Sequence, residues 1–421
     1  FPLDRLIADV PNGVPFFATR RGELSLTHAE AARWLVHVHA FDPSGIKSGA
    51  VGDERVKNGK GYPIGIAWSG WLGGVLVEGK SLKDTLLLNL IAAGDGTTPR
   101  DPDVDLPVWE RPPLTVRDES GYPEQGREPT GPADLYTWPS RRIRLVADGD
   151  RVTGVIIANG NRLQPQNRMR FEPHTAWRRS PNQEKQLKST SPVYMPRAHD
   201  PDRAIWRGLE SLLPAAVARA GSTERITPGV LDWVGHLCVE RVLLDDFPMT
   251  FRAVGMVYGS QSSVVEDVVH DTLNLVAVLA RHDATALVET VTSCVRAADS
   301  AALALGNLAG DLVAAAGGDG TGRRSRAREA LYAEFDTAFR DWLTGVGPDA
   351  DSVDMAITWH RTAHKLTENA AAELLRAVSP AVWEGRVVRQ QVMTAAHAEN
   401  RFRRSLRQAL PHAYVDVAAP A

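Results

Sequence analysis

The sequence has very little cysteine. Cys238 and Cys294 are the only two among its 421 residues. Two cysteines are too few for a disulfide framework or a cysteine-rich zinc site, and this scarcity suits a reducing compartment. The sequence also lacks any run that approaches about 20 apolar residues without a charge, and no signal-peptide pattern opens it. These absences predict a soluble protein of the cytoplasm.

A large net charge is missing as well. The sequence has 48 Lys and Arg residues against 51 Asp and Glu residues, which gives a formal net charge of -3. A chain with this balance does not attract nucleic acid over its whole surface. Any contact with nucleic acid must therefore come from local basic patches.

Recognisable catalytic motifs are missing too. The sequence contains no G-x-x-x-x-G-K-[ST] loop, no G-x-S-x-G, and no paired-carboxylate or Cys/His arrangement. His360 and His364 have the spacing of a zinc-binding pair on a helix, but Arg361 stands where a zinc protease has its glutamate base. No third ligand accompanies them. We therefore expect no catalytic residue, no metal and no cofactor.

Length and periodicity define the expected organisation. At 421 residues and 43% hydrophobic content the chain is long enough for two or three cores, because single cores stop growing near about 250 to 300 residues. We predict an α+β fold, with a mixed α/β N-terminal domain over residues 1–258 and an antiparallel helix bundle over residues 263–421. The first residue is Phe1 rather than Met, so we expect that a natural N-terminal portion is missing.

Several segments have a clear pattern. They predict a helix over 26–41, a strand region in 64–77, a helix over 81–92, a hairpin over 141–157, and bundle breaks at 282–283, 317–322, 345–348 and 379–380. Thr27 and Glu30 supply the start signal of the first helix. Asp148 and Gly149 supply the turn signal of the hairpin.

The stretch 254–267 marks the predicted change from mixed structure to helices. Ser263 followed three residues later by Glu266 is the pattern of a capping box, which predicts a helix that begins at Val264. Gln261 then projects from a short loop with a fixed exit and has no apolar neighbour to bury it. Such a polar side chain is either placed for a function or incidental.

Three loops remain open to two interpretations. Residues 42–65 interleave glycines with lysines, which favours either an anionic ligand close to the backbone or a flexible solvated loop. Residues 164–197 are strongly basic, a composition more often typical of a solvated loop than of a binding groove. The adjacent Phe16 and Phe17 either face a partner or fill a local hydrophobic hole.

Four strings, taken in order, resemble the large subunit of the type I-E CRISPR surveillance complex Cascade, the CasA family. They are PLDRLI at 2–7, GKSLKDTLLLN at 79–89, LYTWPSRRI at 135–143 and VYGSQ at 257–261. None is a sharp signature alone, but their order and the layout of a mixed domain followed by a bundle make the match specific. The resemblance implies a subunit, not an enzyme, that finds the protospacer-adjacent motif (PAM) and starts unwinding beside it.

The resemblance also implies roles for particular residues. Gln261, with Ser260 and Ser262, matches the family's wedge, which enters under the PAM from the minor groove of the DNA duplex. The glycine-rich PAM loop falls on Ser44, Gly45, Ile46, Lys47, Ser48 and Gly49, although this copy has fewer consecutive glycines. The candidates for the family's basic finger are Lys185 and Lys188, with Arg178 and Arg179 behind them.

The same resemblance implies the partners. The loop that contains Phe16 and Phe17 matches the segment that docks on the guide RNA 5′ end and the backbone subunits. The bundle would contact the small subunit and the opened strands, and the whole subunit would recruit the helicase-nuclease. Some relatives carry cysteine pairs for zinc, but this chain has none, so the resemblance predicts no zinc. Two rival hypotheses are a helical scaffold or interaction protein without direct DNA contact, and a hydrolase with an unusual site.

Overall fold

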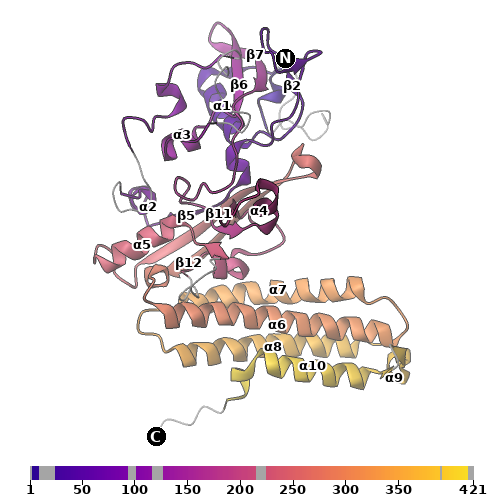
Figure 1. The fold of residues 1–421 in the computed structure, drawn as a ribbon. Coiled ribbons are helices and arrows are strands. Elements are labelled where there is room, and N and C mark those ends of the chain that lie inside the picture. Colours follow the sequence, from indigo (N-terminus) through magenta and orange to yellow (C-terminus); the bar gives the residue numbers. More distant parts are fainter. Residues whose placement is uncertain are drawn as a thin grey trace.

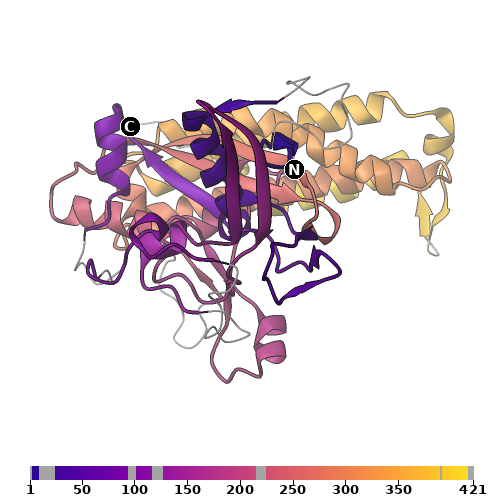
Figure 2. The same ribbon diagram turned by 90° about the horizontal axis from the view of Figure 1, so that it is seen from above.

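The computed structural model describes residues 2–8, 24–92, 101–115, 127–214, 224–388 and 391–415. Small sheets near the N-terminus lie above a central three-stranded sheet, which lies above a layer of long helices (Figure 1). Viewed from above, the long helices extend past the sheets on one side (Figure 2). The predicted α+β fold is confirmed.

The N-terminal layer packs one helix against a sheet of order β1-β7-β6. Its elements are η1 (Leu3–Arg5), β1 (Leu26–Thr27), α1 (His28–Phe41), β6 (Arg141–Asp148) and β7 (Arg151–Asn159). The predicted helix start is confirmed, since the Glu30 amide donates to the Thr27 hydroxyl at 3.2 Å and the Thr27 amide donates to the Glu30 carboxylate at 2.9 Å. The predicted hairpin is confirmed too, with Asp148 paired to Arg151 across a turn in which Gly149 has a φ of 58°.

The glycine-interleaved segment forms a small sheet of its own, of order β2-β4-β3. The strands are β2 (Lys47–Ser48), β3 (Val56–Lys57) and β4 (Lys60–Gly61). The Gly49 amide donates to the Gly59 carbonyl at 3.1 Å, and a Cβ added at Gly49 would lie 2.6 Å from the Val56 side chain. Glycine at position 49 is therefore required by the close packing of the segment itself.

The central sheet has the order β12-β11-β5. Its strands are β5 (Gly73–Glu78), β11 (Pro248–Tyr258) and β12 (Val265–Val276), and the helices beside it are η2 (Trp68–Trp71), α2 (Leu82–Asn89), η4 (Ile205–Ser211), α5 (Gly229–Val239) and η6 (Ala277–Ala280). The predicted helix of residues 81–92 is confirmed as α2, which Ser81 caps by accepting from the Asp84 amide at 3.1 Å. It buries Leu88 and leaves Leu82 and Leu86 exposed.

The predicted helix from Val264 is wrong. Residues 265–276 form β12, which pairs antiparallel with β11, and the long helices begin only at Thr285. Ser263 does not cap a helix, because its hydroxyl donates to the Ser260 carbonyl at 2.9 Å. The run after Ser263 is rich in valine, and β-branched side chains fit a pleated strand better than a helix. Gln261 therefore lies at the end of a hairpin.

The basic segment is folded around a third small sheet, of order β10-β8-β9. The elements of this region are η3 (Val108–Glu110), α3 (Pro132–Tyr136), β8 (Trp177–Arg179), α4 (Pro181–Leu187), β9 (Tyr194–Pro196) and β10 (Arg225–Ile226). Buried aromatic side chains, among them Trp68, Trp138 and Trp177, form the core of this region. The sheet fixes both ends of α4, because β8 precedes the helix and β9 follows it.

A buried carboxyl group helps to hold the entry to this region. The Tyr136 hydroxyl donates to Glu172 at 2.7 Å, and the His174 amide donates to the same oxygen at 3.0 Å. The Val75 amide of β5 in turn donates to the His174 carbonyl at 2.7 Å. Burial raises the pKa of Glu172 from 4.5 to about 7, and the hydrogen bonds from Tyr136 and His174 only partly oppose this.

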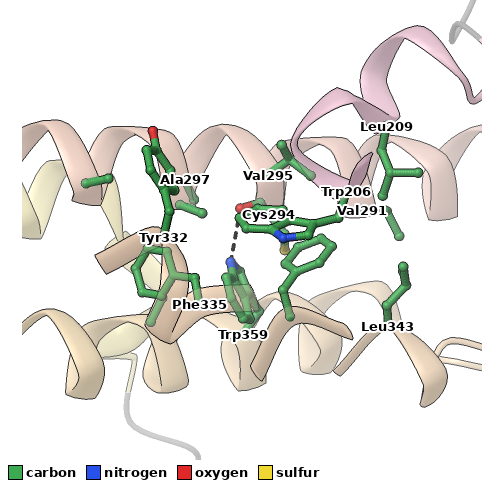
Figure 3. Close-up of a cluster of buried hydrophobic side chains, with 14 of the residues drawn as sticks. Trp206, Leu209, Val291, Cys294, Val295, Ala297, Tyr332, Phe335, Leu343 and Trp359 are labelled. Carbon is green, nitrogen blue, oxygen red and sulfur yellow. Dashed lines mark hydrogen bonds between the residues drawn. The ribbon is translucent and has the colours of Figure 1, made fainter. Parts of the chain in front are cut away.

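Four long helices form the C-terminal bundle. The elements are α6 (Thr285–Ala315), α7 (Thr321–Thr344), α8 (Ser352–Arg376), α9 (Pro380–Glu384), β13 (Arg386–Val388), β14 (Gln391–Met393), α10 (Ala395–Ala409) and η7 (Pro411–Tyr414). The ends of the helices agree with the predicted breaks. In the core, the Trp359 indole donates to the Cys294 carbonyl at 3.0 Å, with Phe335 beside it (Figure 3). Within the described ranges, no helix is long and apolar enough to cross a membrane.

The bundle and the central sheet share one continuous hydrophobic core. Trp206 of η4 reaches into the bundle (Figure 3). Its indole donates to Asp336 of α7 at 2.9 Å. Arg340, one turn later on α7, pairs with Asp271 of β12 at 3.0 Å and also donates to the Thr272 carbonyl. The hairpin of β11 and β12 is thus attached directly to a bundle helix.

The raised pKa of Glu172 gives a testable pH dependence. A carboxyl whose pKa is higher in the folded state binds more protons there than in the unfolded state, so its contribution to stability is full below pH 4.5 and is lost as the pH rises through about 7. We expect Glu172→Gln to remove this fall. Urea unfolding of both proteins across this range measures it, and parallel curves of stability against pH would contradict the assignment.

Candidate nucleic-acid interface

The tip of the β11–β12 hairpin has an unusual backbone. Gln261 and Ser262 have φ values of 55° and 53°, in the left-handed region, within the single turn η5 (Ser260–Ser262). Such conformations cost on the order of 1 to 3 kcal/mol for residues other than glycine and persist only where the surroundings hold them. The turn is closed by the Ser262 amide, which donates to the Gly259 carbonyl at 2.8 Å, and by the Gly259 amide, which donates to the Val264 carbonyl at 3.0 Å.

The side chain of Gln261 is exposed at this tip. Among the described residues it has no hydrogen-bonding partner. The amide group is therefore free to bind another molecule, while the backbone that carries it is fixed by the closed turn. The predicted helix start does not hold this loop; a closed turn at the end of a hairpin holds the backbone of Gln261 instead.

Two hydrogen bonds fix the hairpin tip to the N-terminal layer. The Ser44 amide donates to the Ser262 carbonyl at 2.8 Å, and the Tyr258 hydroxyl donates to the Phe41 carbonyl at 2.7 Å. A Cβ at Gly70 would lie 2.3 Å from the Tyr258 hydroxyl, so this tyrosine needs a glycine beside it. The structure thus brings together Ser44 of the predicted PAM loop and Ser262 of the predicted wedge.

Lys47 of the predicted PAM loop is turned inward. Its ammonium lies 2.6 Å from the Asp42 carboxylate, and only 14% of its side chain is exposed. Asp42 also pairs with Arg141, whose side chain is 1% exposed. Burial lowers the pKa of Lys47, and the negative charge of Asp42 opposes that effect. The charge of Lys47 is therefore compensated within the fold.

The four basic candidates have different environments. Arg179 pairs with Glu184 at 2.8 Å, which ties β8 to α4, so its guanidinium is already engaged. Lys185 on α4 and Lys188 at its C-terminal end are both exposed, and Lys188 has a left-handed φ of 51°. Among the described residues neither ammonium has an ion-pair partner. Arg178 is exposed as well and faces a separate cavity.

Two adjoining cavities connect these elements. One, of about 480 Å³, is lined by Ser44 on one side and by residues 183, 186 and 187 of α4 on the other. The other, of about 630 Å³, is lined by Tyr258 and Ser262 of the hairpin and by Arg178. Ile66, Trp71 and Met195 line both cavities. Ser44 of the predicted PAM loop and α4 therefore line one cavity, and Ser262 of the predicted wedge and Arg178 line the cavity that adjoins it.

Two further pairs of residues from the sequence analysis do not contribute to this site in the part of the chain that the structure describes. Phe16 and Phe17 lie outside the described residues. His360 is buried in the bundle and accepts from the His412 amide at 3.3 Å, and His364 contacts the Tyr414 hydroxyl at 2.8 Å. No cluster of three or more potential metal ligands occurs within the described ranges.

Three residues that hold or line the candidate site could not be recognised from the local sequence pattern. Asp42 and Tyr258 fix the loop and the hairpin, and Arg197 lines the larger cavity. Their importance arises from interactions across long sequence separations, such as the 217 positions between Phe41 and Tyr258. Only the resemblance in the string VYGSQ included one of them, Tyr258.

Comparisons with known proteins give the same class of protein, a large subunit of a CRISPR surveillance complex. The sequence profile of the family described as CRISPR-associated protein Cse1 matches residues 3–370. The chain belongs to this family, the large subunits of type I-E Cascade. The resemblance inferred from the sequence strings is confirmed.

Individual relatives agree with this assignment. The CRISPR-associated protein CasA/Cse1 of Thermus thermophilus is 30% identical over 198 residues, which is 47% of this chain and 34% of that relative's length. The crystal structure of Thermobifida fusca Cse1 matches with a TM-score of 0.86 at 43% identity. The matched region covers 98% of this chain and 77% of the Thermobifida fusca chain. For Acidimicrobium ferrooxidans Cse1 the TM-score is 0.79 at 28% identity, with 97% and 76% covered.

The role of Asp42 can be tested directly. Asp42→Asn would leave the buried Arg141 and Lys47 without a counterion, and removal of one partner from a buried ion pair costs about 3 to 5 kcal/mol. We expect the free energy of unfolding to fall by that amount, with faster amide exchange in residues 43–62. The control Lys47→Met keeps the pair of Asp42 with Arg141 and should cost clearly less. Equal losses for the two variants would contradict the role given to Asp42.

Proposed function

We propose that this chain is the PAM-recognition and target-DNA-binding subunit of a CRISPR RNA-guided surveillance complex. In this proposal Gln261 enters the minor groove beside the PAM and starts duplex unwinding. The observation that carries it is the free amide of Gln261 on a hairpin tip whose backbone is closed by its own hydrogen bonds and joined to Ser44 at 2.8 Å. Membership of the Cse1 family supports it.

A wedge must be stiff, because separation of stacked base pairs costs a few kcal/mol per step. The hairpin meets this requirement through its long pairing of β11 with β12 and through the attachment of Tyr258 to the end of α1. A flexible loop would bend away instead of pushing the bases apart. The minor groove distinguishes mainly A·T from G·C pairs, so a subunit that reads it would tolerate several PAM sequences.

Contacts with the DNA backbone would offset the cost of unwinding. Lys185 and Lys188 are exposed cations on α4, across a cavity from Ser44. Neutralised phosphates release counterions, which favours binding and makes it depend on salt. The loop of residues 44–49, in which Ile46 is exposed, would approach the same duplex.

The proposed partners follow from the family. As a Cascade large subunit the chain would assemble with the guide RNA, the backbone subunits and the small subunit, and would recruit the helicase-nuclease after the duplex opens. One solved structure with the same fold, at a TM-score of 0.52 and 19% identity, is described as a CRISPR RNA-guided surveillance complex.

One observation favours the scaffold alternative for part of the bundle. Arg324 of α7 and Arg401 of α10 both pair with Asp311 of α6, at 3.4 and 3.0 Å, and Arg403 pairs with Glu399 at 2.6 Å. These arginines link helices or stay within one helix. They therefore do not by themselves support contact between the bundle and DNA.

Replacement of Gln261 tests the wedge. Alanine removes the amide but keeps a Cβ, so Gln261→Ala leaves the backbone preference at a φ of 55° nearly unchanged. We expect the complex to assemble normally and to open duplex targets at least tenfold more slowly, because no side chain replaces the unstacked pair. Strand separation can be followed with a fluorescent base beside the PAM. Wild-type opening by Gln261→Ala would favour the scaffold alternative.

Removal of the α4 lysines tests the finger. We expect the double variant Lys185→Ala and Lys188→Ala to weaken duplex binding and to reduce the slope of log affinity against log salt by up to about 1.8, at about 0.9 for each phosphate neutralised. Lys80→Ala with Lys83→Ala is a matched control, since these lysines are also exposed but lie before and within α2, which lines neither of the two adjoining cavities, whereas α4 lines one of them. An unaltered slope for the α4 variant would exclude these lysines from the interface.

A further inference from the structure

The larger cavity beside the hairpin is lined by three arginines. Arg178, Arg197 and Arg203 face it, together with Tyr258 and Ser262 of the hairpin. We call it the arginine cavity. Its volume of about 630 Å³ is within the range of about 300 to 1,000 Å³ that is usual for ligand sites. The cavity therefore has room for more than a small ion.

Positive charge in the arginine cavity is poorly compensated. Arg178 stands directly opposite Arg225 in the pairing of β8 with β10, and like charges in that position repel each other. The nearby Glu210 already lies 2.8 Å from Arg225 and 3.6 Å from Arg296. A local excess of positive charge remains on the side of the cavity formed by β8 and β9.

Two of the arginines have no partner within the described residues. Neither the Arg178 nor the half-buried Arg197 guanidinium makes a hydrogen bond or an ion pair there. Arg203 donates to the Arg207 carbonyl at 3.1 Å, and its nearest carboxylate, Asp299, is 3.9 Å away. An unpaired, partly buried guanidinium is costly, and an anion that accepts both arms of its fork would relieve that cost.

The acidic residues of the cavity do not fill this role. Asp271 accepts from the Ile205 amide at 2.7 Å and pairs with Arg340 of the bundle at 3.0 Å. Arg340 therefore already compensates the charge of Asp271. Asp200 is exposed and accepts from the Asp202 amide at 3.0 Å. Burial lowers the pKa of Arg197, and Arg203 lowers it further. The environment of Arg197 thus suits an external anion.

We propose that the arginine cavity binds a phosphodiester group of the single DNA strand that leaves the duplex at Gln261. This inference rests on the proposed function and adds Arg197 and Arg203 to it. Ser262, the residue after Gln261, lines the cavity, which therefore lies beside the tip at which the proposed wedge would part the strands. Guanidinium groups beside aromatic and apolar side chains, such as Trp71 and Met195, are the combination that single-strand channels use.

The test uses the full chain and a fluorescent oligothymidine in an anisotropy titration over a series of salt concentrations. We expect Arg178→Ala and Arg197→Ala each to weaken binding about tenfold and to reduce the salt slope by about 0.7, the value for one phosphate of a single strand. Arg197→Lys should restore the slope but only part of the affinity, because an ammonium keeps the charge without the fork. Arg144→Ala is the control, since Arg144 is exposed on β6 and lines none of the cavities described.

Arg178 is exposed at the surface, so its replacement should not disturb folding. If thermal melting shows that Arg197→Ala is not folded, Arg178→Ala alone tests the proposal. Wild-type affinity and slope in the arginine variants would overturn the inference. Competition by inorganic phosphate as effective as that by unlabelled oligothymidine, at equal phosphate concentration, would also overturn it and assign the cavity to free anions.

The failure of this inference is distinct from failure of the proposed function. Arginine variants with unchanged strand binding, together with slow duplex opening by Gln261→Ala, would refute the strand site and leave the wedge in place. Weakened strand binding by the arginine variants, together with normal opening by Gln261→Ala, would support the strand site and refute the wedge.

Discussion

The carboxylate of Asp42 neutralises two cations that folding removes from water, and the geometry of the interface depends on it. Arg141 and Lys47 approach this carboxylate from different parts of the chain. On either side of Asp42, the Phe41 carbonyl accepts from the Tyr258 hydroxyl and the Ser44 amide donates to the hairpin tip. Residues 41–44 therefore join α1, the small glycine-rich sheet and the hairpin at one point. Charge compensation here positions the backbone that faces the ligand.

The hairpin tip is built as a rigid projection. Its backbone adopts a conformation that is unfavourable for Gln261 and Ser262, and the closed turn and the hydrogen bond with Ser44 hold it there. Pairing along β11 and β12 and the burial of side chains beneath them offset the free-energy cost of this backbone conformation. The backbone that carries Gln261 is therefore fixed before any ligand arrives, and only the side chain has to order on binding.

The sequence predicted the elements with strong local signals. The capping box of Thr27 with Glu30 and the turn at Gly149 depend on neighbours within a few residues, and both are confirmed. Ser263 with Glu266 has the same spacing as a capping box but lies in a hairpin. The valine-rich strand after it belongs to a sheet in which β11 pairs with both β12 and β5, and such long-range pairing is absent from a local pattern.

For the site, the sequence alone identified residues but not their environments. The resemblance pointed to Gln261 and to residues 44–49, and the structure joins Ser44 to Ser262 by a hydrogen bond. It could not indicate that Lys47 would be turned toward Asp42, or that Arg197 would lack a partner among the described residues, because both depend on charges brought together only by folding. Charge on a side chain is visible in a sequence, whereas its compensation is a property of the fold.

The attachment of Arg340 on α7 to Asp271 and Thr272 on β12 has a mechanical consequence. β12 is 12 residues long, or about 40 Å at roughly 3.4 Å for each residue, and the attachment lies near the middle of the strand, about 20 Å from the end that leads to Gln261. The half of the strand that leads to Gln261 projects from this attachment as an arm. A tilt of about 5° at the bundle would move a point some 20 to 30 Å along that arm by about 2 Å, which is more than half of the roughly 3.4 Å spacing between stacked bases.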